Sequence, residues 1–262
     1  MRSFDRDALA HEHLQPPGGA VKRIALGHGG GSVATVGGMD WARSADELIA
    51  AQRELAAAAP PLWRPDGEAL AGACFVCFPR GKTGSGAAGD PGWAGAALAD
   101  NRTAVAQGVA GAPYEPGLLA LREGPLLEAA VRALPQRPDV LFVNATGRDH
   151  PRRAGLALHL GAVLDVPSLG ITHRPLGARA EAPSDERGAT SPLVLEGDVV
   201  GCLLRTRPGT RPLAVHPGWR IDLENATELV LAHSRRRTPE PLRLARSAAR
   251  SARARAELRS KS

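Results

Sequence analysis

Aromatic side chains are scarce in this chain of 262 residues, where they make up 3% of the sequence and Tyr114 is the only tyrosine. The core must therefore be built from Leu, Val, Ala and Ile, and a hydrophobic share of 43% allows that. No apolar run reaches the roughly 18 residues that a membrane helix needs. The charged stretch 1–13 does not resemble a signal peptide. The sequence predicts a globular, cytoplasmic protein without a membrane partner.

Cysteine is also rare, and the three residues Cys74, Cys77 and Cys202 cannot all pair with one another. A disulfide framework is therefore not expected, and reduced thiols fit the same compartment. Cys74 and Cys77 have C-x-x-C spacing, which can indicate a metal site. Strand positions three apart face opposite sides of a sheet, so two buried core cysteines are the favoured interpretation.

Positive charge is unevenly distributed along the chain, whose formal charge is +6. Residues 235–262 hold ten Arg or Lys and two Glu, a local excess of +8 that leaves −2 for the remainder. Such a segment attracts polyanions, and nucleic acid is the commonest in the cytoplasm. On charge alone, a merely solvated Arg-rich helix is about equally probable.

The order of expected elements indicates the fold class. Residues 1–40 mix Gly, His and Pro without periodicity, which predicts a disordered extension, and Ser44 then caps a helix that Pro60 must end. Strands are expected at 70–78, 93–99, 103–109, 140–144, 168–172, 199–205 and 212–215, and helices at 117–134 with a break at Gly124-Pro125, at 151–164 and at 223–234. Three antiparallel strands followed by alternating helices and strands predict an α/β fold with a ribonuclease H-like mixed sheet flanked by helices. We expect a domain at 41–234, followed at 235–262 by a basic tail that forms a frayed helix.

Several motifs resemble one nuclease family. They are Pro113-Tyr114-Glu115-Pro116-Gly117 with the stretch up to Pro125, Val143-Asn144-Ala145-Thr146-Gly147, His150-Pro151-Arg152-Arg153, Val166-Pro167-Ser168-Leu169-Gly170, Pro217-Gly218 and Thr238-Pro239-Glu240-Pro241. From about Ser44 to about Arg250 the chain is similar to the endonuclease V family. The resemblance implies a monomeric nuclease, dependent on Mg²⁺ or Mn²⁺, that recognises deaminated bases, chiefly inosine, in DNA or RNA and cuts one linkage to the 3′ side.

The resemblance also implies which residues contact nucleic acid. A wedge that opens the base stack corresponds to Pro113-Tyr114-Glu115-Pro116, in which Tyr114 can stack on a base. The pocket for the displaced base corresponds to Gly117, Leu119 and Gly147. The segment that begins at His150 would contact nucleic acid, with Arg152 and Arg153 able to meet phosphate. Taken singly, each glycine is better explained as a tight turn, and arginines on an exposed first turn are usually solvated.

The catalytic positions depart from the family pattern. Only Glu123 keeps a carboxylate in register. The first-strand aspartate falls on Cys74 or Phe75, and the other positions are occupied by Asn144, His173 and Trp219. Glu123 and Asn144 alone make a poor magnesium site, since Mg²⁺ requires a rigid set of oxygen ligands.

These losses predict a nucleic-acid-binding protein in which hydrolysis is absent or weak. One alternative is an active endonuclease that uses Glu123, Asn144 and Asp149 around a divalent ion. Another is a protein-interaction scaffold that no longer binds nucleic acid.

Overall fold

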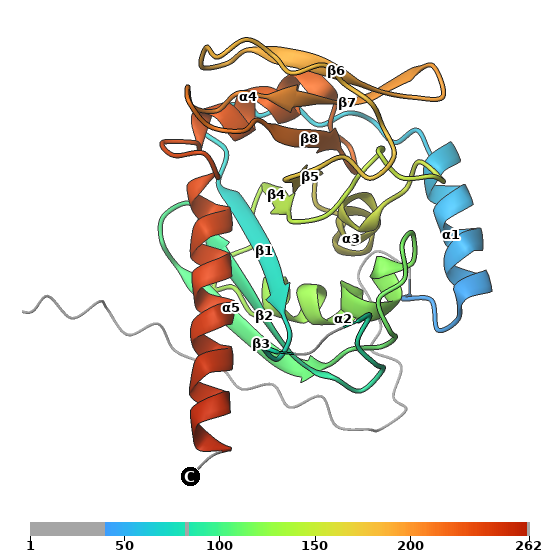
Figure 1. The fold of residues 1–262 in the computed structure, drawn as a ribbon, viewed down its shortest axis with the longest axis vertical. Helices are drawn as coiled ribbons and strands as arrows, with labels where there is room; N and C mark the ends of the chain where they lie inside the picture. The colour runs from blue at the N-terminus through green and yellow to red at the C-terminus, as the bar shows by residue number, and fades with distance from the viewer. Residues whose placement is uncertain (1–39, 82–83, 261–262) are drawn as a thin grey trace, which may run out of the picture.

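A single eight-stranded mixed sheet organises the molecule (Figure 1), and the computed structural model describes residues 40–81 and 84–260. The strands are β1 (Ala71–Cys77), β2 (Pro91–Leu98), β3 (Thr103–Val109), β4 (Val140–Val143), β5 (Ser168–Thr172), β6 (Thr190–Leu195), β7 (Asp198–Leu204) and β8 (Leu213–Pro217). Their order across the sheet is β3-β2-β1-β4-β5-β8-β7-β6. The expected disordered extension lies, apart from Asp40, outside the described residues.

Strand direction decides where side chains can meet. β1, β4 and β5 are parallel to one another, and the other neighbouring pairs are antiparallel. The strands expected at 93–99 and 103–109 form an antiparallel hairpin, with Asn101 of the turn in the left-handed region at φ 74°. Because parallel strands end at the same edge of a sheet, the residues after β4 and β5 face a common hollow.

Helices cover both faces of the sheet, as the sequence predicted. The helices are α1 (Ala45–Ala57), α2 (Leu119–Arg132), α3 (Leu156–Leu164), α4 (Leu223–Ala232) and α5 (Glu240–Arg259). One face packs α2 and α3 on a core that includes Cys74, Leu141 and Val143, and α1 lies outside these two helices. The other face packs α4 and α5 on a core that includes Phe142. Ser44 caps α1 by accepting from the Glu47 amide, as expected.

The expected break at Gly124-Pro125 is wrong, because α2 runs through both residues. The ring of Trp41 lies against Gly124, and Trp41 Nε1 donates to Glu128 at 2.6 Å. Leu126 is fully buried on the same helix. These contacts outweigh the local cost of a proline, whose own side chain is exposed.

The helix expected from Pro151 is also shorter than predicted, since α3 begins at Leu156. Arg153 adopts φ +57°, which no right-handed helix accommodates, so 150–153 is a turn. Strand β6, which contains Pro192, was not predicted from the sequence. An edge strand tolerates proline, and β6 is at the edge of the sheet.

The basic segment forms a packed helix rather than a frayed one. α5 crosses β1 and β2 and buries Leu242, Ala245 and Ala249. A Cβ on Gly95 of β2 would lie 2.3 Å from the Ala245 carbonyl oxygen, so the missing side chain lets the helix approach the sheet. The expected tail is therefore one layer of the fold, seen in red at the left of Figure 1.

Among the helices of the described residues, none combines the length and apolar character required to span a bilayer.

Candidate nucleic-acid-binding site

A small pocket opens where α2 begins and β4 ends. Its volume is about 200 Å³, below the usual range for drug-sized ligands and suited to a single base. The lining residues come from several segments that are distant in the sequence: Gln52, Tyr114, Glu115, Gly117, Leu119, Ala120, Asn144, Ala145, Thr146, His150, Leu156, Thr172, Arg174, Pro175 and Leu176. The structure thus places Gly117 and Leu119, two of the three residues expected at a base pocket, together with Tyr114 of the expected wedge and with His150.

The wall of this pocket is fixed around one carbonyl group. The Gly117 carbonyl oxygen accepts from Gln52 Nε2 at 3.1 Å and from Arg152 Nη2 at 2.8 Å, and His150 Nε2 lies 3.1 Å away. Gly117 has φ +83°, and a Cβ there would lie 3.1 Å from Arg152 Nη2. The position therefore requires glycine both for its backbone conformation and for space.

His150 is neutral in this arrangement. Its Nδ1 accepts from the Arg152 amide at 3.1 Å, so the proton belongs on Nε2, which then donates to the Gly117 carbonyl. Burial lowers the pKa of His150 to about 4, and the nearby Arg152 charge acts in the same direction. The imidazole is thus a fixed hydrogen-bond donor in the pocket wall.

The wedge loop stands out from the pocket rim. Pro113, Tyr114, Glu115 and Pro116 are all exposed, and the loop is tied to the body by the Tyr114 amide, which donates to the Ser85 carbonyl at 2.8 Å. Tyr114 is 47% exposed. Its ring is available to stack on a base.

Two arginines expected to meet phosphate are instead held by protein groups. Arg152 Nε donates to Gln52 Oε1 at 2.6 Å in addition to its bond with Gly117. Arg153 donates to the Leu195 carbonyl and also reaches two carboxylates of the β6–β7 turn. Gly147 likewise lies outside the pocket lining, where it contacts the end of β8 at Pro217.

The structure does not bring all the expected catalytic positions together. Cys74 is fully buried, and the nearby Glu123 adds to the burial that raises the pKa of its thiol. Burial raises the pKa of Glu123 to about 8 against the opposing charge of Arg122, although part of the residue remains accessible. Near neutral pH this carboxyl is therefore largely protonated.

All three cysteines are buried and free, as predicted.

Asn144 has a partner that the sequence did not reveal. Arg246 of α5 donates from Nη2 to Asn144 Oδ1 at 3.2 Å, and its guanidinium carbon lies 5.1 Å from the centre of the Phe75 ring. In the β1–β4 register Cys74 pairs with Val143, so Phe75 rather than Cys74 is level with Asn144. The only signal in the sequence was the charge of 235–262, which does not single out Arg246.

His173 shares this edge of the sheet, and Trp219 does not. Partial burial and the charges of Arg237 and Arg246 lower the pKa of His173. The Trp219 backbone pairs with Ser168, at the opposite end of β5, and its ring packs near α3. The structure therefore does not bring Trp219 to Asn144.

The residues at this edge do not fit a magnesium ion. Within residues 40–81 and 84–260, no group of three or more His, Cys, Asp or Glu side chains could hold a metal. Asp149, considered as a replacement ligand, is fully buried and accepts from the backbone amides of Leu176, Gly177 and Ala178. With Asn144 bound to a guanidinium, the edge carries positive charge where a cation would need negative charge.

Comparisons with known proteins agree with the motifs. The family model described as Endonuclease V matches residues 94–247. The Endonuclease V of Methanopyrus kandleri is 49% identical over 142 residues, which are 54% of this chain and 61% of that protein. The chain thus aligns with about three fifths of the length of the curated relatives it matches.

Solved structures extend the likeness to most of the chain. The Endonuclease V of Streptomyces avermitilis has a TM-score of 0.74 and 34% identity, and the match covers 83% of this chain and 96% of that one. The Endonuclease V of Ciona intestinalis, in complex with a 24mer DNA containing an inosine followed by a ribo-adenosine, has a TM-score of 0.62 at 19% identity, over 83% of this chain and 98% of that one. The expected ribonuclease H-like fold is confirmed.

Proposed function

This chain belongs to the endonuclease V family, and from that premise we propose that it binds DNA or RNA carrying a deaminated base such as inosine, with phosphodiester hydrolysis lost or severely weakened. The observation that carries the proposal is the contrast between a formed pocket at Gly117 and a catalytic edge at Asn144 that bears an arginine. Binding of a displaced base needs the pocket, and hydrolysis needs carboxylates at the catalytic edge.

The pocket supports recognition of a flipped base. Leu119, Ala120 and Leu156 give it apolar walls, and Tyr114 at the rim gives a ring on which a neighbouring base can stack. The Gly117 carbonyl is already saturated by three donors, so it shapes the wall rather than reading the base. Selection among bases then rests on the size of the cavity and on its remaining backbone groups.

The catalytic edge supports loss of hydrolysis. A divalent ion would have to displace Arg246 from Asn144 and deprotonate Glu123, whose pKa is raised to about 8. Neither change is compensated by another carboxylate at this edge among the described residues. The residues therefore favour a protein whose binding needs neither Mg²⁺ nor Mn²⁺.

The test combines binding and cleavage on the same oligonucleotides. Fluorescence anisotropy would compare inosine-containing and matched guanosine-containing strands, single and double, of DNA and RNA, in Mg²⁺, Mn²⁺ or EDTA. Inosine is the chosen probe because the DNA in the Ciona structure contains it. We expect tighter binding to inosine strands in all three conditions, without cleavage products on a denaturing gel.

Variants separate the possible outcomes. Tyr114→Ala should weaken binding about tenfold, since stacking on an aromatic ring contributes about 1–3 kcal/mol per base. Val199→Ala, another exposed apolar position, on the β6–β7 hairpin, should leave affinity unchanged. Cleavage beside inosine that disappears in Glu123→Ala would overturn the loss of hydrolysis. Absence of binding to every strand would favour the protein-interaction scaffold.

A further inference from the structure

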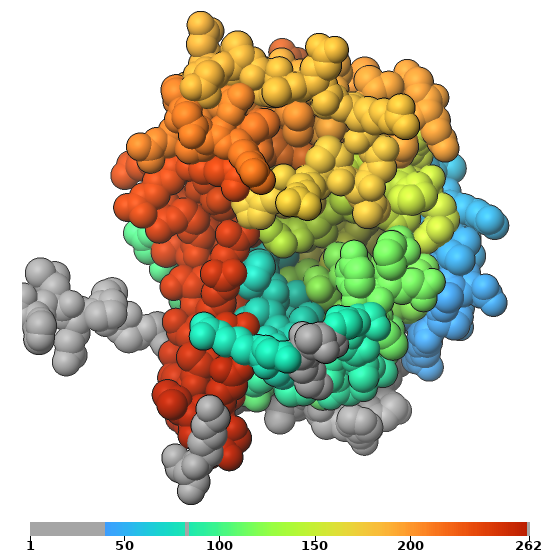
Figure 2. Space-filling model, in the orientation of Figure 1, coloured from blue at the N-terminus to red at the C-terminus, as the bar shows by residue number. Residues whose placement is uncertain are grey.

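A groove of about 630 Å³ runs along the outer face of α5. Its lining is dominated by arginine and comes mostly from helix positions three or four apart: Arg80, Arg236, Arg237, Thr238, Arg243, Arg246, Ser247, Arg250, Ser251 and Ala254. None of these residues is acidic. In Figure 2, α5 is the red column at the left, and the surface is hollowed beside it.

Most of the positive charge in the groove is not neutralised by the protein. Arg243 pairs with Glu240, at 2.5 Å. In the described part of the chain, Arg236, Arg246 and Arg250 have no carboxylate within ion-pairing distance. Several unpaired cations on one concave surface form a site suited to a polyanion.

Arg246 differs from the other arginines of the groove in having a buried donor without a partner among the described residues. Its Nε is buried and has no hydrogen-bond partner among the described residues, and its one bond to protein goes to a neutral amide. Burial lowers its pKa, and the charges of Arg250 and Arg237 lower it further. A half-buried cation with an unpaired donor and cationic neighbours favours an anionic ligand.

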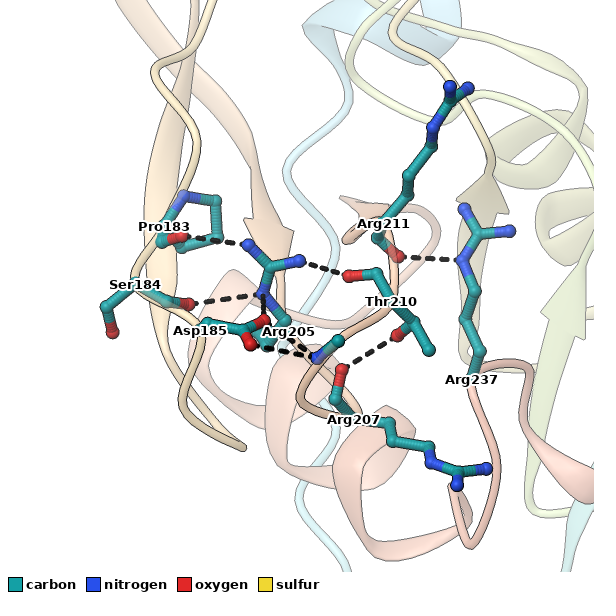
Figure 3. A network of polar contacts seen from close by, with 9 residues as sticks. Pro183, Ser184, Asp185, Arg205, Arg207, Thr210, Arg211 and Arg237 are labelled. Atoms are coloured by element: carbon teal, nitrogen blue, oxygen red, sulfur yellow. Dashed lines mark hydrogen bonds and ion pairs between the residues drawn. The ribbon is translucent and has the colours of Figure 1, made fainter.

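Arg237 is held in place by hydrogen bonds to backbone carbonyl groups. Its Nε donates to the Arg211 carbonyl at 2.7 Å and its Nη2 to the Pro212 carbonyl at 3.2 Å. Figure 3 shows the supporting network, in which Arg205 bonds the carbonyls of Pro183 and Thr210 on either side. The loop that carries Arg237 is thus tied to its surroundings before any ligand binds.

The groove and the base pocket meet at a single hydrogen bond. Asn144 lines the pocket, Arg246 lines the groove, and the two are joined at 3.2 Å. A strand whose base occupied the pocket would therefore have Arg246 on the Asn144 side of that base. The adjacent phosphates can then continue along α5.

We propose that the α5 groove is a metal-independent phosphodiester site, in which Arg246 binds the phosphate next to the pocketed base and Arg236 and Arg250 bind the phosphates that follow. This inference rests on the proposed function for the location of the base. The guanidinium replaces, with one positive charge and a fork of donors, the charge that a divalent ion would bring to the phosphate. Its binding energy positions the strand and activates no nucleophile.

The test isolates phosphate from base. An oligonucleotide made only of abasic tetrahydrofuran residues carries the phosphates without a base, and inosine as a free nucleoside carries the base without a phosphate. We expect the abasic strand to bind equally in EDTA and in Mg²⁺ and to weaken steeply with salt, as phosphate contacts do. Inorganic phosphate as competitor would distinguish a site for single phosphates from one for a chain.

Matched variants locate the site. Arg246→Met keeps the apolar stem of the side chain but not its charge, and it should lower abasic-strand affinity about tenfold and reduce the salt slope by about one. Arg255→Met removes an exposed charge of the same helix outside the groove and should change affinity less than twofold. Asn144→Asp should also lower the affinity for the abasic strand, because the new carboxylate would pair with Arg246. Arg246→Lys should give an intermediate affinity, since it keeps the charge but not the fork.

The outcomes distinguish this inference from the proposed function. If Arg246→Met and Arg255→Met lose affinity equally, or if neither loses any, the groove is not the phosphate site, even if inosine is still preferred. If the abasic strand behaves as expected but inosine gives no preference, the phosphate site stands and base recognition fails. Binding of the abasic strand that requires Mg²⁺ would overturn the inference. Circular dichroism of each variant would establish that it is folded.

Discussion

The base pocket around Gly117 lies beside the sheet edge at Asn144 and Arg246, and the two differ in how completely their polar groups are hydrogen-bonded. At the pocket, the Gly117 carbonyl has three donors and the Asp149 carboxylate has three amides. At the edge, Arg246 leaves a buried donor unpaired beside two further arginines. Satisfied buried polar groups stabilise a fold, whereas unsatisfied charge favours a ligand. The comparison indicates that the pocket is stable without its ligand and that the edge is stabilised by binding.

Measurements of unfolding free energy on single variants can test this difference between the pocket and the edge. Substitutions in the pocket wall should lower the free energy of unfolding, and substitutions at the edge should not. Equal effects in both regions would show that the contrast in hydrogen bonding has no energetic meaning.

The largest loss is expected for Asp149→Ala. The substitution removes the acceptor for three backbone amides of the loop that carries Leu176 to the pocket. Leaving buried donors unpaired should cost about 3 kcal/mol of unfolding free energy, measured by urea denaturation. Asp198→Ala removes an exposed carboxylate of an ion pair and serves as the control, with an expected change below about 0.5 kcal/mol.

Acid should weaken the pocket next most strongly. The folded-state pKa of His150 is about 4, below its usual value of 6.5, so the folded protein binds fewer protons than the unfolded chain between these values. The stabilisation is present above pH 6.5 and is lost as the pH falls toward 4, by up to about 3 kcal/mol for this residue. His159 and His216, also lowered to about 4 by burial, act in the same direction.

His150→Gln provides the control for that pH profile. The amide can still donate to the Gly117 carbonyl but cannot take up a proton. The variant should therefore show a shallower loss of stability between pH 6.5 and 4, and it should retain inosine binding at pH 5 better than the parent. An unchanged profile would mean that His150 does not titrate in this range.

Much of the fold was predictable from local patterns. The apolar stretches of β1 and β4, the turn at Asn101 and the cap at Ser44 each determine an element from a few neighbouring residues. The errors arose where distant contacts decide. Trp41 keeps α2 continuous across Pro125, and packing against Gly95 orders a helix that charge alone suggests is frayed.

In the candidate site, too, local motifs were predictable from the sequence and contacts between distant residues were not. The wedge and pocket motif is contiguous, so Tyr114, Gly117 and Leu119 could be placed together from the sequence. The partnership of Asn144 with Arg246 joins residues 102 positions apart and depends on where α5 crosses the sheet. Likewise, nothing local indicated that Arg152 would bond inward to Gly117 instead of facing phosphate.

A smaller loss is expected for Arg152→Met. The variant keeps the apolar stem but removes the bonds to Gly117 and Gln52, while the Gly117 carbonyl retains two other donors. We expect a decrease of about 1.5 kcal/mol in urea denaturation and a weaker preference for inosine. The salt dependence of abasic-strand binding should not change. A decrease in that salt slope would instead show that Arg152 contacts phosphate.

The smallest effect on stability, and the one of opposite sign, is expected for Arg246→Met in the absence of any polyanion. The variant loses one bond to Asn144 and the contact with Phe75, but it relieves repulsion from Arg237 and Arg250 and removes a buried unpaired donor. The free energy of unfolding should therefore rise, by less than about 1 kcal/mol. A loss larger than that would show that Arg246 mainly holds α5 on the sheet, and its effect on nucleic-acid binding would then be indirect.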